Sequence, residues 1–232
     1  CPFKFLAEAI IKLTPLESIT DGIPPQERGQ RLHQALSRFT KLCREQGGLK
    51  NLNETEAKRL LATAIQDVLS DVADSPVWIL EQERWIGDEG PVPGLLIQWL
   101  ALELDRVKNG WIWSAEEIPF KNLSDPEWPF TLTGRIDRID IHSEDGIFLW
   151  DYKSGQIPSR SKIFVDLASP QLPAYVKAAK SGLVPDLATN HKRAISSGFI
   201  TLESLLKVAH KALSPPKNNW DDFLNQWRGS IP

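Results

Sequence analysis

Sulfur-containing residues and long apolar runs are almost absent from this sequence. It has no methionine and two cysteines, Cys1 and Cys43. Two cysteines cannot build a framework of several disulfides, and no apolar run approaches the roughly 18 residues of a membrane-spanning helix. We recognise no signal peptide, so we expect a cytoplasmic protein without a membrane partner. Because the chain starts at Cys1 and lacks methionine, we also expect it to be part of a longer protein.

What remains is the composition of an ordinary globular chain. Of its 232 residues, 41% are hydrophobic and 25% are charged, which is enough for one sizeable domain. The net charge of −3 argues weakly against a free-standing nucleic-acid binder. Residues 151–217 nevertheless hold ten Lys or Arg against four Asp or Glu, a local charge of +6. This stretch is compatible with phosphate contact, or simply with a solvated helix face.

Helical periodicity dominates the first half of the chain. Apolar residues recur every three to four positions in residues 2–13, 26–46, 53–72 and 95–108. Pro15, Gly47 and Pro76 supply the stop signals after the first three. Asn53, with Glu56 three residues later, predicts a capping box at the start of the third helix.

Strands follow, interrupted by one helix. We expect strands at residues 111–120, 131–141, 146–153 and 195–202, a helix at 172–180 and a short terminal helix at 218–227. Ser-Glu-Asp-Gly at 143–146 joins the second and third strands as a hairpin. This order predicts a single α/β domain over 1–232, with a mixed central sheet flanked by helices. Residues 1–110 would form a mainly helical part and residues 111–232 the sheet core.

Each arm of the hairpin carries an aspartate, Asp137 in the first and Asp151 in the second. Side chains alternate faces along a strand, so Asp151 and Lys153 point the same way. The apolar alternation of the first arm changes phase near Asp137, and we expect a bulge or bend at Asp137–Arg138. Two carboxylates on neighbouring strands beside an ammonium group suit a hard divalent cation and a water aimed at a phosphate.

These residues resemble the PD-(D/E)XK nuclease signature: Asp137, thirteen intervening residues, then Asp-Tyr-Lys. The surrounding motifs are similar to the RecB-type exonuclease subfamily at residues 27–33 (ERGQRLH), 134–140 (GRIDRID), 150–155 (WDYKSG) and 171–175 (QLPAY). Cys-Pro-Phe at 1–3 resembles the start of an AddB-like nuclease domain. The resemblance covers essentially the whole chain and implies a restriction-endonuclease-like fold.

The resemblance also implies roles for individual residues. His33, Asp137, Asp151 and the backbone carbonyl of Tyr152 would bind the cation. Oxygen ligands suit Mg²⁺ or Mn²⁺, and an imidazole favours Mn²⁺. Lys153 would orient or deprotonate the attacking water. The catalytic set would thus comprise Asp137, Asp151 and Lys153, with Gln171 and Tyr175, four apart on one helix, bracing the lysine or a phosphate.

One feature of the AddB-like family is missing from the motif set. Such domains often hold an iron–sulfur cluster on four cysteines, one of them in the N-terminal Cys-Pro. Here Cys1 alone matches, and Cys43 falls in the middle of a predicted helix as a buried apolar residue. Because a cluster needs about four thiolates, we predict none in this chain.

Several site residues have structural alternatives. In the structural alternative, Asp137 and Asp151 pair with Arg135 or Arg138, and His33 is a core histidine. Gln171 and Tyr175 could pack their helix on the sheet. Either Glu116 or Glu117 could be an additional acidic ligand of the cation. Equally, both could be charged residues on the surface of a strand. The nine tryptophans fit core packing better than stacking platforms for single strands.

Three functions fit these observations. The first is a metal-dependent DNA exonuclease domain that works with a helicase subunit or domain in double-strand-break repair and recombination. The second is a nuclease-like scaffold without catalysis that binds and threads DNA. The third is a restriction-like endonuclease. Retention of His33, Asp137, Asp151 and Lys153 together favours the first.

Overall fold

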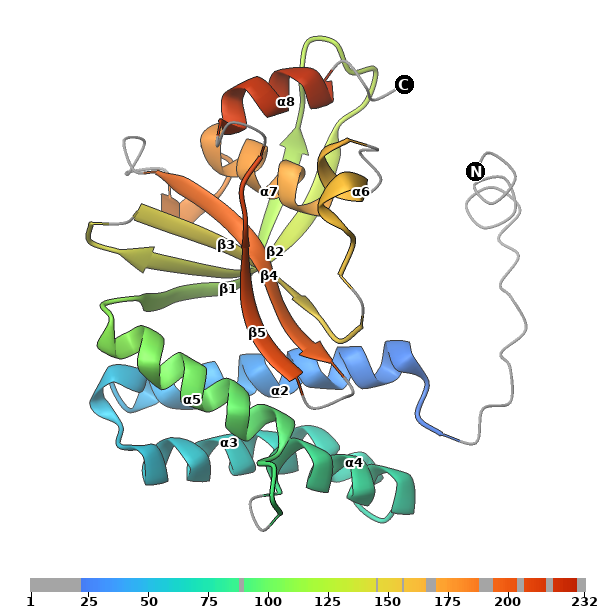
Figure 1. Cartoon of the computed structure of the whole chain (residues 1–232), viewed down its shortest axis with the longest axis vertical. Helices are drawn as coiled ribbons and strands as arrows, with labels where there is room; N and C mark the ends of the chain where they lie inside the picture. The colour runs from blue at the N-terminus through green and yellow to red at the C-terminus, as the bar shows by residue number, and fades with distance from the viewer. Residues whose placement is uncertain are drawn as a thin grey trace.

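The computed structural model describes residues 22–87, 90–144, 146–155, 157–165, 170–187, 194–203, 207–215 and 219–228. The helix expected at 2–13 and the Cys-Pro-Phe motif lie outside these residues. The described part forms a mixed sheet with helices on both faces, which confirms the predicted α/β class (Figure 1). Among the described residues, no helix has the length and apolar character required to cross a membrane.

The central sheet has five strands in the order β1-β2-β3-β4-β5, which are Ile112–Leu123, Leu132–His142, Gly146–Lys153, Ile195–Glu203 and Lys207–Leu213. Neighbouring strands pair antiparallel except β3 and β4, which run parallel. The β2–β3 hairpin forms as predicted. A parallel pair needs a crossover connection, and α6 (Arg160–Phe164) and α7 (Gln171–Lys180) lie in that connection.

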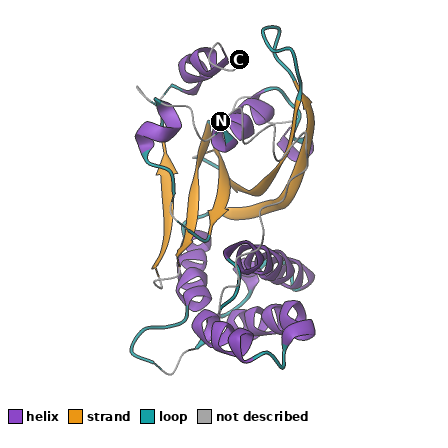
Figure 2. Cartoon of the chain, turned by 90° about the vertical axis from the view of Figure 1, so that its right-hand side faces the viewer, coloured by secondary structure: helices purple, strands orange, loops and turns teal. Residues whose placement is uncertain are grey.

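Helices cover each face of the sheet with its own hydrophobic core (Figure 2). One face packs against α6, α7 and α8 (Trp220–Arg228). The other packs against the helical N-terminal part, which consists of α2 (Pro25–Glu45), α3 (Glu54–Leu69), α4 (Pro76–Ile86) and α5 (Leu95–Lys108), with short 3-10 turns at Leu49–Asn51, Ser70–Val72 and Pro185–Leu187. The capping box of Asn53 and Glu56 is present at the start of α3.

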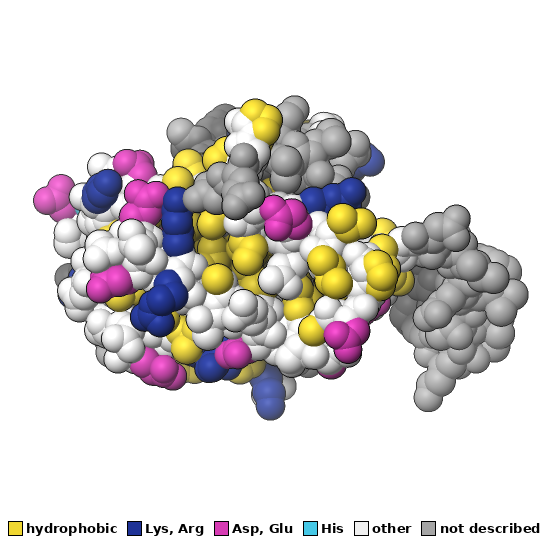
Figure 3. Space-filling model, turned by 90° about the horizontal axis from the view of Figure 1, so that it is seen from below, with side chains coloured by type: hydrophobic (Ala, Val, Ile, Leu, Met, Phe, Trp, Pro, Cys, Tyr) yellow, Lys and Arg dark blue, Asp and Glu magenta, His cyan; other side chains and the backbone are white. Residues whose placement is uncertain are grey.

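Sequence periodicity did not predict α4, α6 and β5. In α4 the buried side chains are Trp78, Glu81 and Trp85, whereas Ile79 and Leu80 are 53% and 62% exposed. One buried glutamate and two exposed aliphatic side chains weaken the amphipathic pattern, so periodicity gives only a weak helix signal. Apolar side chains are exposed among scattered charges on the helical side of the molecule (Figure 3).

The bend expected in β2 near Asp137–Arg138 is present. Ile136 and Ile139 both belong to the core beneath α7, so the strand switches phase between them. The register of β1 and β2 runs evenly from Ile118↔Ile136 to Glu116↔Arg138, so the switch is a bend and not a bulge in this ladder. The bend is shared with β1, where Glu117 has a φ of 53°. The β2–β3 ladder ends beside it, at Arg138↔Trp150.

Candidate active site

His33 enters the site from α2. Pro25 in the first turn and acidic Glu27 favour the start of this helix, and its buried stripe anchors it on the helical core. His33 lies beside that stripe and is half-buried, with its ring edge-on to the Tyr152 ring at 5.5 Å. Gly29, one turn earlier, allows α2 to approach the end of β3, because a Cβ there would lie 3.2 Å from Ser154 Oγ.

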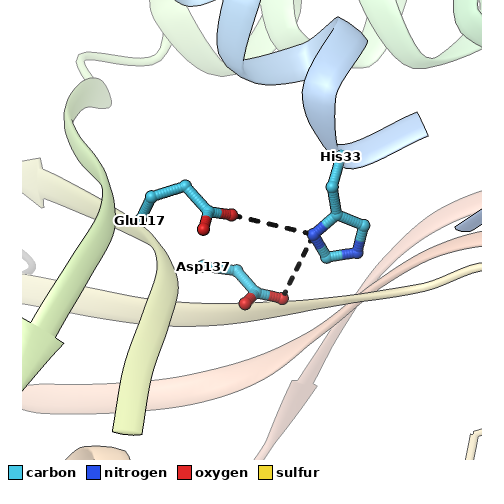
Figure 4. Close-up of side chains that lie close together, drawn as sticks. All are labelled: His33, Glu117 and Asp137. Atoms are coloured by element: carbon cyan, nitrogen blue, oxygen red, sulfur yellow. Dashed lines mark ion pairs between the residues drawn. The ribbon is translucent and has the colours of Figure 1, made fainter. Parts of the chain in front are cut away.

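His33, Glu117 and Asp137 converge where α2 meets β1 and β2, and we name these three side chains the acidic cluster (Figure 4). His33 Nδ1 lies 3.8 Å from Glu117 Oε1 and 4.0 Å from Asp137 Oδ2. One ligand atom from each residue lies within 4.8 Å of the others. Asp137 Oδ2 also accepts a hydrogen bond of 2.9 Å from the backbone N–H of Tyr152, which fixes the carboxylate against β3.

Glu117 reaches the cluster because its backbone adopts an unusual conformation. A φ of 53° places it in the left-handed region, which costs a residue with a Cβ about 1–2 kcal/mol. Such conformations persist where the surrounding structure imposes them, and they concentrate at functional sites. Arg135 on β2 forms an ion pair of 2.7 Å with the other carboxylate oxygen of Glu117. Glu116 points elsewhere and pairs with Arg44.

Asp151 and Lys153 lie next to the acidic cluster on β3. Lys153 Nζ is 2.7 Å from Asp151 Oδ2 and donates a hydrogen bond of 2.7 Å to Gln171 Oε1. Tyr175 donates from its hydroxyl to Asp151 Oδ1 at 3.2 Å. Gln171 and Tyr175 project from the same face of α7. The lysine is therefore held between a strand carboxylate and a helix amide.

Burial and like charges perturb the titration of this site. Burial, together with the nearby charge of Asp151, raises the pKa of Asp137 to about 6. Burial lowers the pKa of His33, but Glu117, Asp137 and Asp151 outweigh it and leave that pKa raised. The neighbouring imidazole of His33 lowers the pKa of Glu117 in spite of its burial. Burial and the neighbouring carboxylates Asp137 and Asp151 raise the pKa of the Tyr175 hydroxyl.

The arrangement fits a divalent cation. Two carboxylates and an imidazole form a donor set that Mg²⁺ and especially Mn²⁺ accept. Asp151 Oδ2 is buried, and its described polar partner is the ammonium group of Lys153 at 2.7 Å. Asp137 and Glu117 lie beside this pair, so the pocket holds more carboxylates than the lysine neutralises and is stabilised when a further positive charge enters it.

The arginines proposed as alternative partners of the aspartates bind elsewhere. Arg135 pairs with Glu117. Arg138 is buried and forms a two-pronged pair with Glu103, at 2.7 and 2.6 Å, and a second pair with Asp140. Arg106 also pairs with Asp140 at 2.7 Å. We name these four residues the arginine cluster. No described arginine forms an ion pair with Asp137 or Asp151.

The structure brings together most of the residues that the sequence suggested, but the three side chains of the acidic cluster include one residue that we did not expect there. Glu117 takes the place beside His33 and Asp137 that we expected Asp151 to fill, and Asp151 is turned toward Lys153 and Tyr175. The sequence offered Glu117 only as one of two adjacent glutamates. Its distinguishing feature is the left-handed backbone, which the sequence does not reveal. Tyr152 contributes its N–H to Asp137, and the role of its carbonyl stays a prediction.

Most tryptophans are packing residues, as expected. Trp78, Trp85, Trp99, Trp150 and Trp227 are buried in the two cores. Trp111 and Trp113 are partly buried and lie under the guanidinium groups of Arg106 and Arg138. Cys43 is buried as well, and burial raises the pKa of its thiol to about 12, so it is an unreactive core residue.

Comparison with known proteins agrees with this geometry. A family model described as the PD-(D/E)XK nuclease superfamily matches residues 1–231. No curated protein matches the chain. The family match spans the helix that carries His33, both aspartate-bearing strands and α7. The chain therefore belongs to the PD-(D/E)XK nuclease superfamily, whose members are metal-dependent nucleases.

Proposed function

We propose that this chain hydrolyses phosphodiester bonds of DNA as a divalent-metal-dependent exonuclease domain, with Mg²⁺ or Mn²⁺ as its cofactor. The observation that carries the proposal is the convergence of His33, Glu117 and Asp137 next to the Asp151–Lys153 pair. Glu117 is paired with Arg135, but Asp137 forms no ion pair with any described arginine or lysine. The two carboxylates face one another and an imidazole, so together they are suited to a cation.

Within this proposal the chain's own groups divide the work. His33, Glu117 and Asp137 would bind the cation, and Asp151 would add a ligand by turning its Oδ2 from Lys153. The cation, when bound, supplies Lewis-acid charge at the scissile phosphate. Lys153, held by Gln171, would orient or deprotonate the attacking water and offset negative charge in the transition state. Tyr175 would hold the Asp151 carboxylate in place through its hydroxyl.

The wider setting of the proposal is a helicase-linked role in double-strand-break repair and recombination. It is supported by the resemblance of the site motifs to RecB- and AddB-type exonucleases. The overall charge of −3 adds to this, because a chain with so little positive charge is expected to bind DNA weakly by itself. A partner that unwinds the duplex and delivers a strand to the site would compensate for this weak DNA binding.

The decisive test is nucleotide release from linear DNA in Mg²⁺ or Mn²⁺, with EDTA as the metal-free control. Asp151→Ala and Lys153→Ala should each lower the rate by at least about 10³-fold, the scale of losing a catalytic proton-transfer or electrostatic group. Lys121→Ala, which removes an exposed strand lysine outside the site, is the matched control and should retain activity. Unchanged rates in both site variants would refute the assignment.

Two further outcomes separate the other functions. Cleavage of covalently closed circular DNA would indicate an endonuclease, whereas activity restricted to linear DNA supports the exonuclease. A wild-type chain that binds DNA but releases no nucleotides in either metal would favour the scaffold.

A further inference from the structure

A cavity of about 830 Å³ opens directly beside the acidic cluster. His33 and Glu117 line both the cavity and the cluster, so whatever occupies the cavity reaches the cation site. The rest of its wall comes from α2 over Pro25–Lys41, from Val68 on α3, and from Arg135 and Ser154 at the sheet. We name this cavity the α2 groove.

The wall that α2 contributes is polar along its whole length. Its side chains recur at helical spacing on one face: Gln26, Gln30, Gln34, Ser37 and Lys41. The three glutamines and the lysine are exposed. The fifteen helical steps from Gln26 to Lys41 extend about 22 Å, so this face is a row of hydrogen-bonding groups rather than a single contact point. A glutamine amide both donates and accepts, so it can bond to phosphates, sugars and base edges.

Positive charge in the α2 groove is mostly committed to partners. Arg38 forms an ion pair of 2.7 Å with Asp67, and Arg135 forms one with Glu117. Lys41 forms no ion pair with any described residue, although its charge contributes to the lowered pKa of Glu117. A strand in this groove would thus be held by amides, with Lys41 as the main free cation.

The size and charge of the α2 groove favour a single DNA strand over a double helix as its ligand. Its volume falls in the range of about 300–1,000 Å³ that accepts a compact ligand. A space of this size suffices for a few nucleotides of one strand, and a groove with little uncommitted positive charge is poorly suited to the two phosphate backbones of a double helix. Among the described residues that line the groove there is no Phe, Trp or Tyr, so within this part of the chain stacking does not replace the hydrogen bonds.

From these observations we infer that the α2 groove seats a single DNA strand along Gln26, Gln30, Gln34 and Lys41 and delivers its backbone to the acidic cluster. This inference rests on the proposed nuclease function, since it names the form in which the substrate reaches that site. These α2 side chains are positioning residues, because they lie outside the group that would bind the cation.

The test measures binding of a labelled short oligothymidine in EDTA, where no cleavage occurs, over a range of salt concentrations. For a single strand, the logarithm of the affinity falls with the logarithm of salt by about 0.7 per neutralised phosphate. Lys41→Ala should weaken binding about fivefold and make this slope shallower by about 0.7. The double variant Gln30→Ala/Gln34→Ala should weaken binding about tenfold and leave the slope unchanged.

Matched controls come from the same helical layer. Gln46→Ala removes an exposed glutamine at the end of α2, outside the groove, and Lys108→Ala removes an exposed lysine on α5. Both should bind as the wild type does. A blunt duplex of the same length should bind at least about tenfold more weakly than the single strand. All four variants change exposed side chains, and their thermal unfolding should match that of the wild type.

The outcomes separate the groove from the catalytic proposal. If the glutamine and lysine variants bind normally while Asp151→Ala abolishes cleavage, the groove assignment is wrong and the nuclease function stands. If oligothymidine binding depends on the α2 face but no divalent cation supports cleavage, the groove stands and the nuclease function falls. Duplex binding as tight as that of the single strand would also overturn the groove assignment.

Discussion

The acidic cluster and the arginine cluster occupy adjacent positions on the same strand, yet their charges are balanced in opposite ways. Arg138 directly follows Asp137 on β2, and the two side chains belong to different clusters. In the arginine cluster two guanidinium groups face two carboxylates, and Trp150 and His210 supply further contacts at 2.9 and 3.0 Å. In the acidic cluster two carboxylates face one imidazole.

The pKa values of the carboxylates differ between the two clusters in the same way. Burial opposes ionisation of Glu103, but the charge of Arg138 prevails and lowers the pKa of Glu103 to about 2. Burial and Asp151 raise the pKa of Asp137 to about 6. Each carboxylate is largely buried, so burial alone does not distinguish them. What distinguishes a structural from a functional acid here is whether the fold itself supplies the compensating charge.

Breaking the arginine cluster should have the largest effect on stability. Glu103→Gln leaves the buried guanidinium of Arg138 with one carboxylate partner fewer, and loss of one partner of a buried pair costs about 3–5 kcal/mol. We therefore expect the free energy of unfolding, measured by urea titration, to fall by that amount. Glu27→Gln, at a half-exposed pair with Arg31, is the control and should change it by less than about 1 kcal/mol. If both variants lose the same free energy of unfolding, Glu103 is no more important to stability than a surface carboxylate, and the arginine cluster is not a structural ion-pair network.

Neutralising the acidic cluster should act in the opposite direction. Asp137→Asn keeps an acceptor for the Tyr152 N–H but removes a charge that the metal-free fold disfavours. In EDTA at pH 8 we expect the free energy of unfolding to rise by about 1–3 kcal/mol, the scale of a two-unit pKa shift. Saturating Mn²⁺ should stabilise the wild type and not the variant. A variant that is destabilised in EDTA would show that Asp137 is structural.

The pH dependence of unfolding should resolve the two clusters in one experiment. Asp137 has a folded-state pKa of about 6 against an ordinary 3.8, so between these values the folded state binds more protons and stability falls as pH rises. Glu103 has a folded-state pKa of about 2 against 4.5, so its contribution is present above pH 4.5 and lost as pH falls toward 2. In EDTA, Asp137→Asn should flatten the first limb and Glu103→Gln the second. Loss of both limbs in one variant would contradict two independent clusters.

The sequence predicted the pieces of the site better than their exact assembly. Spacing along two strands was sufficient to single out Asp137, Asp151 and Lys153, because side-chain alternation and the hairpin turn are local properties. His33 was singled out by the resemblance of its motif to the RecB-type subfamily. The exchange of Asp151 for Glu117 in the acidic cluster was not predictable. Glu117 has a left-handed backbone in β1, a conformation that is uncommon for residues other than glycine and that the sequence does not indicate.

The same difference between local and tertiary information explains which helices could be predicted from the sequence. Helices α2, α3 and α5 have strong apolar stripes, and α3 also has a capping box, so local sequence patterns found them. Helix α4 buries Glu81 through a hydrogen bond from Trp85 Nε1 of 2.7 Å and an ion pair with Arg28 from α2. Those partners come together only in the folded chain, so a pattern based on hydropathy cannot anticipate the burial of a glutamate.

The smallest expected effect concerns the backbone of Glu117 itself. Glu117→Gly and Glu117→Ala both remove the carboxylate, so both should weaken Mn²⁺ binding to the same degree, measured by calorimetry. They should differ in stability, because alanine retains the cost of a left-handed φ and glycine does not. We expect the glycine variant to have the higher free energy of unfolding, by about 1 kcal/mol. If alanine is equally stable, the bend shared by β1 and β2 does not impose this conformation. If Mn²⁺ binding is unchanged in both, Glu117 is a strand-surface residue and the cation site lies between His33, Asp137 and Asp151.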